Sequence, residues 1–209
     1  MMLKIHIIRH GKTSGNENGR YIGSTDEPLS PAGISELKKT MSLGVYPACD
    51  TVYSSPMLRC LQTADILYPD KPRVIIPTLA EYHFGLFEGK NYDELNGTHD
   101  YQTFIDSGGK SPIPGAPPIE EYWADCALAF RDILEKAKAT IEKGSIAKDI
   151  LVKNVIAIIC HGGTIMAIMR YLYPQRDPYD FRPRNGEGYS LDYNCETEEF
   201  RSIDIIRTT

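Results

Sequence analysis

The hydrophobic residues of this chain fall into short continuous runs, separated by stretches in which apolar residues recur with helical spacing. Six of the runs predict strands, because they are short, apolar and rich in β-branched or aromatic residues. They lie at residues 3–9, 51–53, 73–76, 155–160, 188–193 and 200–206. The fourth run is apolar throughout, which is typical of a strand buried on both faces. The last two flank a polar turn and are expected to pair as an antiparallel hairpin.

Helical patterns lie between these strands. Ser30-Pro31 predicts a helix start, with serine as the N-cap and proline in the first helical position. Further helices are expected from the Ser-Ser-Pro sequence at 54–56, over residues 120–143, and after the His-Gly-Gly sequence at 161–163. This alternation of strands and helices predicts an α/β fold in which helices cover both faces of a parallel sheet.

Residues 80–120 interrupt the alternation. They contain short polar pieces rich in glycine and proline, including the sequence Ser-Pro-Ile-Pro-Gly-Ala-Pro-Pro at 111–118. We interpret them as a lid-like insertion of short helices and loops over the edge or mouth of the sheet. A length of 209 residues is compatible with one domain, so we expect a single domain over 1–209 with an insertion at about 80–120.

Charge and composition exclude several function classes. The net charge is -5 and the isoelectric point is near 5.6, which disfavours a nucleic-acid binder that relies on bulk positive charge. Any anionic ligand must therefore be held by a local cluster of cations. No apolar run approaches the roughly 20 residues needed to span a membrane. We expect neither a nucleic-acid nor a membrane partner.

The cysteines indicate the compartment. Five are scattered along the chain without CxxC spacing, which is typical of a reducing environment and disfavours both a disulfide framework and a zinc site. We therefore expect a cytoplasmic protein with no metal site. Cys160 stands beside His161, but its place at the end of an apolar strand favours a buried, inert thiol.

Two predicted strands are each followed by a histidine and a glycine. The first is followed by Arg9, His10 and Gly11, and the fourth by His161 and Gly162. Ligands of α/β proteins bind at the carboxyl ends of the strands. An arginine supplies a planar fork of donors for phosphate, and a histidine supplies a nucleophile or base near neutral pH. The second histidine also precedes a helix N-terminus, where an anion is favoured. The two ends together indicate a shared anion site.

Four further residues lie where they can join this site. Arg59 lies one turn into the helix that follows the second strand, and Glu81 follows the third strand. Asn16 and Arg20 lie in the loop after His10. Such a set suits phosphoryl transfer without a metal or cofactor: a histidine attacks phosphorus, cations neutralise the phosphate oxygens, and a carboxylic acid protonates the leaving group.

The order of these motifs resembles the histidine phosphatase superfamily, which has the phosphoglycerate-mutase-like fold, over nearly the whole chain. The matching residues are Arg9-His10-Gly11, Asn16, Arg20-Tyr21, Gly23, Ser54-Ser55-Pro56, Arg59, Gln62-Thr63-Ala64, Glu81 to Gly89 and His161-Gly162-Gly163. The resemblance implies a three-layer α/β/α sandwich with a mainly parallel, six-stranded sheet. It also implies an enzyme, a histidine acid phosphatase-type phosphomonoesterase.

The resemblance implies a role for each matching residue. His10 is the residue that becomes phosphorylated, and Glu81 is the proton donor. Arg9, Arg59 and His161 form the phosphate pocket. The expected substrate-binding residues are Asn16, Arg20, Tyr21, Gly23 and Gly162.

Two other functions stay open. A phosphoglycerate mutase is one, although the mutase branch carries an arginine pair for a second phosphate, and segment 97–119 of this chain has Lys110 as its only cation. A noncatalytic phospho-ligand-binding domain is the other, although a pure binder has no need of both His10 and Glu81. We therefore expect a phosphatase, similar to the α-ribazole phosphatases and the small broad-specificity phosphatases.

The expected substrate is a small phosphorylated metabolite whose leaving group lies under segment 97–119. Tyr21, Tyr82 and Phe84 are candidate walls for an apolar or ring-bearing group. Trp123 is expected to pack in the core through its helix, with a place in this wall as the alternative. The identity of the metabolite and the oligomeric state do not follow from the sequence.

Overall fold

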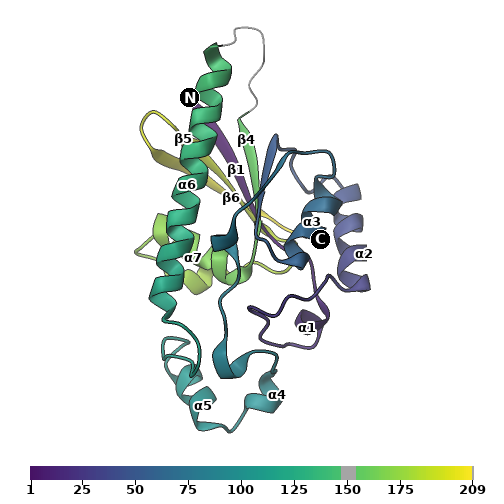
Figure 1. Cartoon of the computed structure of the whole chain (residues 1–209), viewed down its shortest axis with the longest axis vertical. Helices are drawn as coiled ribbons and strands as arrows, with labels where there is room; N and C mark the ends of the chain where they lie inside the picture. Colours follow the sequence, from purple (N-terminus) through teal and green to yellow (C-terminus); the bar gives the residue numbers. More distant parts are fainter. Residues whose placement is uncertain (147–153, 209) are drawn as a thin grey trace.

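Six strands form one sheet in the order β3-β2-β4-β1-β5-β6, and helices cover it on both faces (Figure 1). The computed structural model describes residues 1–146 and 154–208. The strands are β1 Met2–Arg9, β2 Thr51–Ser54, β3 Arg73–Ile75, β4 Val155–Cys160, β5 Gly188–Asn194 and β6 Glu199–Ile206. The α-helices are α1 Ser14–Glu17, α2 Pro31–Ser42, α3 Leu58–Leu67, α4 Tyr92–Leu95, α5 His99–Asp106, α6 Ile119–Ile146 and α7 Gly162–Leu172. Three 3₁₀ helices complete the described elements, η1 Pro77–Leu79, η2 Gly85–Phe87 and η3 Pro178–Phe181.

The sheet is mainly parallel. β1, β2, β3 and β4 run in one direction, whereas β5 pairs antiparallel with β1, and β6 pairs antiparallel with β5. The register aligns Arg9 with Cys160, so the carboxyl ends of β1 and β4 finish side by side. The three-layer α/β/α prediction and the C-terminal hairpin are confirmed.

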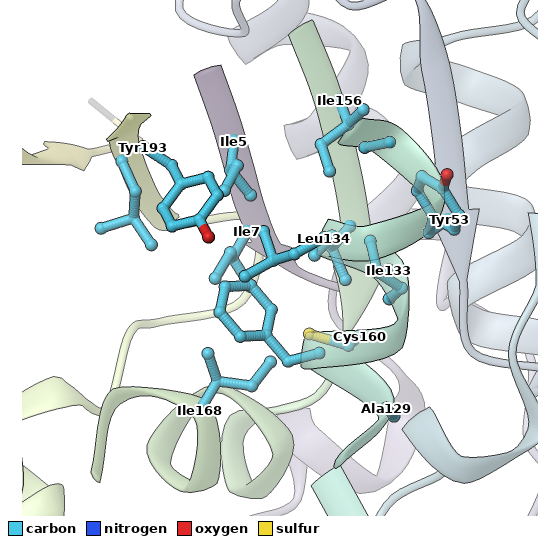
Figure 2. Packing of buried hydrophobic residues seen from close by; sticks show 14 of the residues in the cluster. Ile5, Ile7, Tyr53, Ala129, Ile133, Leu134, Ile156, Cys160, Ile168 and Tyr193 are labelled. Carbon is cyan, nitrogen blue, oxygen red and sulfur yellow. The ribbon is translucent and has the colours of Figure 1, made fainter. Parts of the chain in front are cut away.

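Each sheet face has its own apolar core. Side chains alternate along a strand, so Ile5, Ile7 and Ile158 point to one face, and Ile8 and Ile159 point to the other. Helices α6 and α7 cover the first face, where Figure 2 shows Ile133, Leu134 and Ile168 packed against the strands. Helices α2 and α3 cover the second face. Two packed faces fix the positions of the strand ends, on which the site is built.

The insertion contributes no strand to the sheet over the described residues and packs as a unit of its own. Tyr82, Phe87, Leu95, Tyr101 and Ile113 form a third apolar cluster, separate from the two sheet cores. In Figure 1 the helices α4 and α5 lie at the far end of the molecule from the N-terminus, below the sheet. The insertion therefore covers the end at which β1 and β4 finish.

Helix α3 begins later than the sequence predicts. The Ser-Ser-Pro sequence at 54–56 continues the strand, because the backbone N–H of Ser55 still donates to the carbonyl of Ile159 at 3.0 Å. A residue before proline favours an extended backbone, which delays the helix. Met57 caps α3 without a side-chain hydrogen bond.

No helix in the described part of the chain is long and apolar enough to cross a bilayer.

Candidate active site

The two histidines meet at the carboxyl ends of β1 and β4. The backbone N–H of His10 donates to the carbonyl of Cys160 at 2.9 Å, which places His10 beside His161. The two rings lie 5.1 Å apart at an angle of 62°. Their exposed fractions are 3% for His10 and 0% for His161. The shared site predicted from the two strand ends therefore has its two imidazoles in contact and shielded from water.

One hydrogen bond sets the tautomer of His10. Its Nδ1 lies 2.7 Å from the carbonyl oxygen of Gly11. A carbonyl only accepts, so Nδ1 carries the proton and the Nε2 of the neutral ring keeps its lone pair. Burial, together with the guanidinium groups of Arg9 and Arg59, lowers the pKa of His10 well below its usual value. His10 is thus held in the form that a nucleophile requires.

His161 is also neutral, and both of its ring nitrogens have partners. Arg59 Nε donates to Nδ1 at 3.2 Å, so Nε2 carries the proton and donates to Ser55 Oγ at 2.7 Å. Burial lowers the pKa of His161 well below its usual value, and His10, Arg59 and Arg9 lower it further. In this arrangement His161 orients Arg59. A direct bond from its Nε2 to phosphate requires this N–H to leave Ser55.

Arg59 is fully buried, and a loop holds its guanidinium in place. Nη1 donates to the carbonyl of Thr25 and Nη2 to that of Gly23, each at 2.8 Å. The loop is anchored in turn by Glu88, whose Oε1 accepts from the N–H groups of Gly23 and Thr25 at 2.9 and 3.0 Å. Burial opposes ionisation of Glu88, but its backbone hydrogen bonds lower its pKa below the usual value. Glu88 therefore positions Arg59 through two backbone segments.

Gly23 serves this loop and does not line the cavity. A Cβ added to it would lie 1.9 Å from the carbonyl oxygen of Tyr82, so no other residue fits. The structure gives Gly23 a role in holding Arg59, and substrate binding by Gly23 stays a prediction.

Arg9 is the second guanidinium beside the histidines. Its Nη1 donates to the carbonyl of Pro183 at 2.9 Å. Its Nε is buried and has no hydrogen-bond partner in the structure. Burial lowers the pKa of Arg9 to about 10, and the positive charges of Arg182 and Arg59 contribute. A buried N–H without a partner is costly, and an anion bound between Arg9 and His10 would supply one.

Glu81 is held at the N-terminus of α7. Its Oε1 accepts from Tyr122 Oη at 2.8 Å and from the N–H of Tyr82 at 3.0 Å, and its Oε2 accepts from the N–H of Gly163 at 3.1 Å. Burial and the Glu81 carboxyl raise the pKa of Tyr122 well above its usual value, so this phenol stays a donor. Oε2, with a single partner, is the oxygen left to carry a proton. The N-terminus of α7, where the sequence predicts an anion, thus also holds the protein's own carboxyl group.

Two asparagines close the other side. The Oδ1 of Asn16 accepts from Asn185 Nδ2 at 2.9 Å and from the N–H of Thr13 at 3.3 Å. Its oxygen is therefore engaged, and its amide N–H₂ group is the part left for a ligand. Asn185 also donates to the carbonyl of His10 at 3.2 Å, which ties the loop before β5 to the site.

Arg20 borders the cavity, but its guanidinium is bound to the protein. Its Nη1 donates to the carbonyl of Gly89 and pairs with Glu94 at 2.7 Å. The predicted ligand role of Arg20 is thus limited to the rim, because this guanidinium nitrogen already has two acceptors.

A cavity of about 400 Å³ opens above these groups. Arg9, Asn16, Glu81 and Gly162 line its inner end, next to the buried rings of His10 and His161. Its outer walls include six aromatic residues, Tyr21, Tyr82, Phe84, Phe104, Trp123 and Tyr179, together with a proline-rich stretch of the insertion at 112–118. Tyr21, Tyr82 and Phe84 line the cavity as expected, and their contact with a ring-bearing group of the substrate stays a prediction.

The expectation for Trp123 is wrong. It is half-buried and borders the cavity, with the guanidinium of Arg170 stacked 4.2 Å from its ring centroid. Its position on α6 comes before the stretch that faces the sheet core, in which Ala129 and Phe130 are buried. A helix longer than the sheet that it covers leaves its first turns free for another role.

Sequence reasoning missed several residues of the site. Asn185, Arg182 and Tyr179 lie more than 15 residues beyond the His-Gly-Gly sequence in a stretch without hydrophobic periodicity. Ser55 and Tyr122 lie in or next to predicted elements, but nothing in a single sequence marks which polar residue turns inward.

Among the described residues, no group of three or more His, Cys, Asp or Glu side chains is arranged to hold a metal ion. All five cysteines are free and buried, and burial raises the pKa of Cys160 well above its usual value, which agrees with an inert thiol.

A sequence model of the histidine phosphatase superfamily (branch 1) matches residues 5–205 of this chain. The chain belongs to the histidine phosphatase superfamily. Among its curated relatives in this superfamily, the 2,3-bisphosphoglycerate-dependent phosphoglycerate mutase of Bifidobacterium longum (strain DJO10A) is 26% identical, over 82% of this chain and 78% of the relative. The putative phosphoserine phosphatase 2 of Hydrogenobacter thermophilus is also 26% identical, over 80% and 77%.

Solved structures agree with this membership. The phosphoserine phosphatase of Entamoeba histolytica, in complex with 3-phosphoglyceric acid, has a TM-score of 0.72 and 25% identity over 96% of each chain. A putative α-ribazole-5′-P phosphatase of Escherichia coli has a TM-score of 0.72 and 22% identity over 97% of this chain and 96% of its own, which shows the shared fold. The superfamily thus includes phosphatases and mutases, and an enzyme of one of these kinds is supported.

Proposed function

We propose that this protein is a metal-independent phosphatase that hydrolyses a small phosphomonoester through a phosphohistidine on His10. The observation that carries the proposal is the state of His10. Its Nδ1 proton is held by Gly11, its ring is neutral, and its pKa is lowered by burial and by Arg9 and Arg59. A histidine kept neutral between two cations is suited to attack a dianion, because the same cations attract the phosphate.

In the first step, His10 Nε2 forms a bond to phosphorus while the bond from phosphorus to the ester oxygen breaks. Glu81 gives its proton to the departing oxygen, so the alcohol leaves neutral and Glu81 becomes a carboxylate. Arg9 and Arg59 balance the charge on the phosphate oxygens. The Nδ1–H···O=C bond to Gly11 persists and stabilises the ring as its charge increases.

In the second step, the Glu81 carboxylate takes a proton from water as the water oxygen attacks phosphorus. The P–N bond breaks, inorganic phosphate forms and neutral His10 is restored with its lone pair on Nε2. Glu81 ends protonated, as it began. Each turnover therefore consumes one ester and one water.

The substrate is proposed to be a phosphorylated metabolite with an apolar or ring-bearing leaving group. The supporting features are a 400 Å³ cavity and its aromatic walls, which include Tyr82, Phe84 and Trp123. Named relatives act on several different phosphate esters, so the superfamily alone does not identify the metabolite. A cytoplasmic location, and the absence of nucleic-acid and membrane partners, stay predictions from the sequence.

The decisive experiment is the hydrolysis of 4-nitrophenyl phosphate with EDTA present. The wild type should release phosphate at an unchanged rate in EDTA, and His10→Ala should reduce the rate to background. His99→Ala is the matched control, because His99 is an exposed histidine on α5. Loss of wild-type activity in EDTA would exclude metal independence, and equal rates for wild type and His10→Ala would exclude His10 as the nucleophile.

The same preparation separates the two alternatives. A mutase should move phosphate between positions of a phosphoglycerate and release little inorganic phosphate. A noncatalytic binding domain should neither release phosphate nor become labelled. The proposed phosphatase should acquire an acid-labile radiolabel from a labelled ester, and the label should be absent from His10→Ala.

A further inference from the structure

Arg20, Lys110 and Arg182 line the cavity but have no role in the proposed mechanism, and Arg20 is already paired with Glu94. Arg182 follows η3, is exposed, and borders the same cavity as Arg9 and Glu81. Among the hydrogen bonds and ion pairs of the described residues, none involves its guanidinium. A cation that lines an aromatic cavity without a protein partner is available to a ligand.

The backbone on either side of Arg182 is fixed to the inner site. Its neighbour Pro183 accepts from Arg9 Nη1 at 2.9 Å. Slightly further along, the N–H of Gly186 lies 3.1 Å from the carbonyls of both Arg9 and His10. The guanidinium of Arg182 therefore extends from an anchored base, and a fixed base reduces the entropy lost when the side chain binds.

The charge of Arg182 reaches both the inner end and the rim of the cavity. It contributes, after burial, to the lowered pKa of Arg9, and it opposes the burial that raises the pKa of Tyr179. Arg9 and Arg59 are already buried beside His10 and serve the transferred phosphate. Arg182 is exposed, so it lies further out, where a leaving group would be.

The opposite walls do not neutralise Arg182. Segment 97–119 meets η3 at Gly109, where an added Cβ would lie 2.2 Å from Tyr179 Oη, and it contributes a second exposed cation, Lys110. The acidic residue of the outer cavity is Glu120 on α6, whose charge acts on Tyr82 at another wall. The charged residues that line the side of the cavity formed by η3 and segment 97–119 are thus both cations, Lys110 and Arg182, whereas Asp177 and Asp180 at η3 do not line it.

We propose that Arg182 binds a carboxylate carried by the leaving group, and so selects phosphomonoesters that have a second anionic group. The planar guanidinium fork matches the two oxygens of a carboxylate. The aromatic walls on either side would hold the group that connects this carboxylate to the phosphate. This inference rests on the proposed phosphatase function and adds a subsite on the leaving-group side.

The test uses two substrates that differ in one charge, 3-carboxyphenyl phosphate and its amide, 3-carbamoylphenyl phosphate. The readout is the ratio of kcat/KM for the acid to kcat/KM for the amide. Arg182→Gln should lower this ratio about tenfold to thirtyfold, the effect expected for one hydrogen bond to a charged group. Arg184→Gln is the matched control and should leave the ratio unchanged, because Arg184 is exposed and does not line the cavity.

Two outcomes overturn the proposal. An unchanged ratio in Arg182→Gln means that Arg182 does not contact the leaving group. An equal loss on both substrates means that Arg182 serves the phosphate itself. If the wild type hydrolyses neither these esters nor 4-nitrophenyl phosphate, the proposed function fails, and binding of the two matching benzylphosphonates tests Arg182 alone. The acid must then bind more tightly than the amide in the wild type and lose that preference in Arg182→Gln.

Discussion

The inner and outer ends of the cavity are built in different ways. The inner end is centred on the histidines at the ends of two central strands, and these histidines and Arg59 of α3 are almost fully buried. Nearly every polar atom there has a partner in the protein, as the bonds of Arg59 to Gly23 and Thr25 illustrate. The outer end is rich in aromatic rings from the insertion, α6 and η3, and the rings of the insertion are held by apolar packing.

The difference assigns chemistry and selection to separate parts of the chain. Substitutions at the inner end should change the rate of phosphoryl transfer for every ester, because charge placement there is fixed by hydrogen bonds. Substitutions at the outer end should change which ester is preferred, because the apolar area buried there depends on the size and shape of the leaving group. The predictions below test this division, beginning with the largest expected effect.

Glu81→Gln should lower kcat/KM by about 10² to 10⁴ for an alkyl phosphate, the usual range for general acid catalysis. The loss should be much smaller for an activated aryl phosphate, whose leaving group hardly needs a proton, provided that phosphorylation limits the rate. The measurement is a comparison of both esters under single-turnover conditions. Equal losses would show that Glu81 is not the acid, and His83→Ala would then test the next carrier of a proton.

Gly163→Ala should lower kcat by about 10² through displacement of Glu81, the size expected for a misplacement of about 1 Å. The added Cβ would lie 2.3 Å from Glu81 Oε1. The same variant assayed on an activated aryl phosphate is the control, because that leaving group hardly needs the proton of Glu81 and its loss should be much smaller. Equal losses on the alkyl and the aryl ester would show that the position of the carboxyl does not matter.

Trp123→Leu should raise KM for a ring-bearing ester about threefold to tenfold, in line with the loss of one aromatic contact. The kcat should change little, because Trp123 lies away from the histidines on the outer wall. Leu128→Ala serves as the control on the same helix, since Leu128 is 54% exposed and does not border the cavity. A fall in kcat without a change in KM would break the division between the two ends.

The smallest effect concerns stability and pH. Burial, helped by Lys4 and opposed by Asp192, lowers the pKa of His6 to about 4. The unfolded chain therefore binds a proton at His6 below about pH 6.5 while the folded chain does not, so stability falls as the pH drops towards 4. His6→Asn should reduce the loss between pH 7 and pH 5 by about 1 kcal/mol, measured by urea unfolding. An unchanged pH dependence would contradict this assignment.

The sequence predicts the sheet, its two helical layers and the residues at strand ends, because hydrophobic periodicity and punctuation by His, Gly and Pro are local signals. Arg9, His10 and His161 could be placed because β1 and β4 were recognisable as buried parallel strands. Arg182 and Asn185 could not, because they lie in irregular backbone held by tertiary bonds such as those to Arg9 and His10. The environment of Trp123 likewise could not be predicted, because it depends on which turns of α6 extend beyond the sheet.

The bonds of Arg59 have a consequence for how the protein becomes active. They join residues 34, 36 and 102 positions away from Arg59 in the sequence. Closing such distant segments is slow compared with forming helices, because chain entropy must be lost before the contacts form. Catalytic activity therefore requires that these distant segments have come together. A chain whose helices have formed, but whose loop at Gly23 and Thr25 has not yet bonded to Arg59, would be compact and inactive. During refolding, activity should therefore recover later than the helical signal.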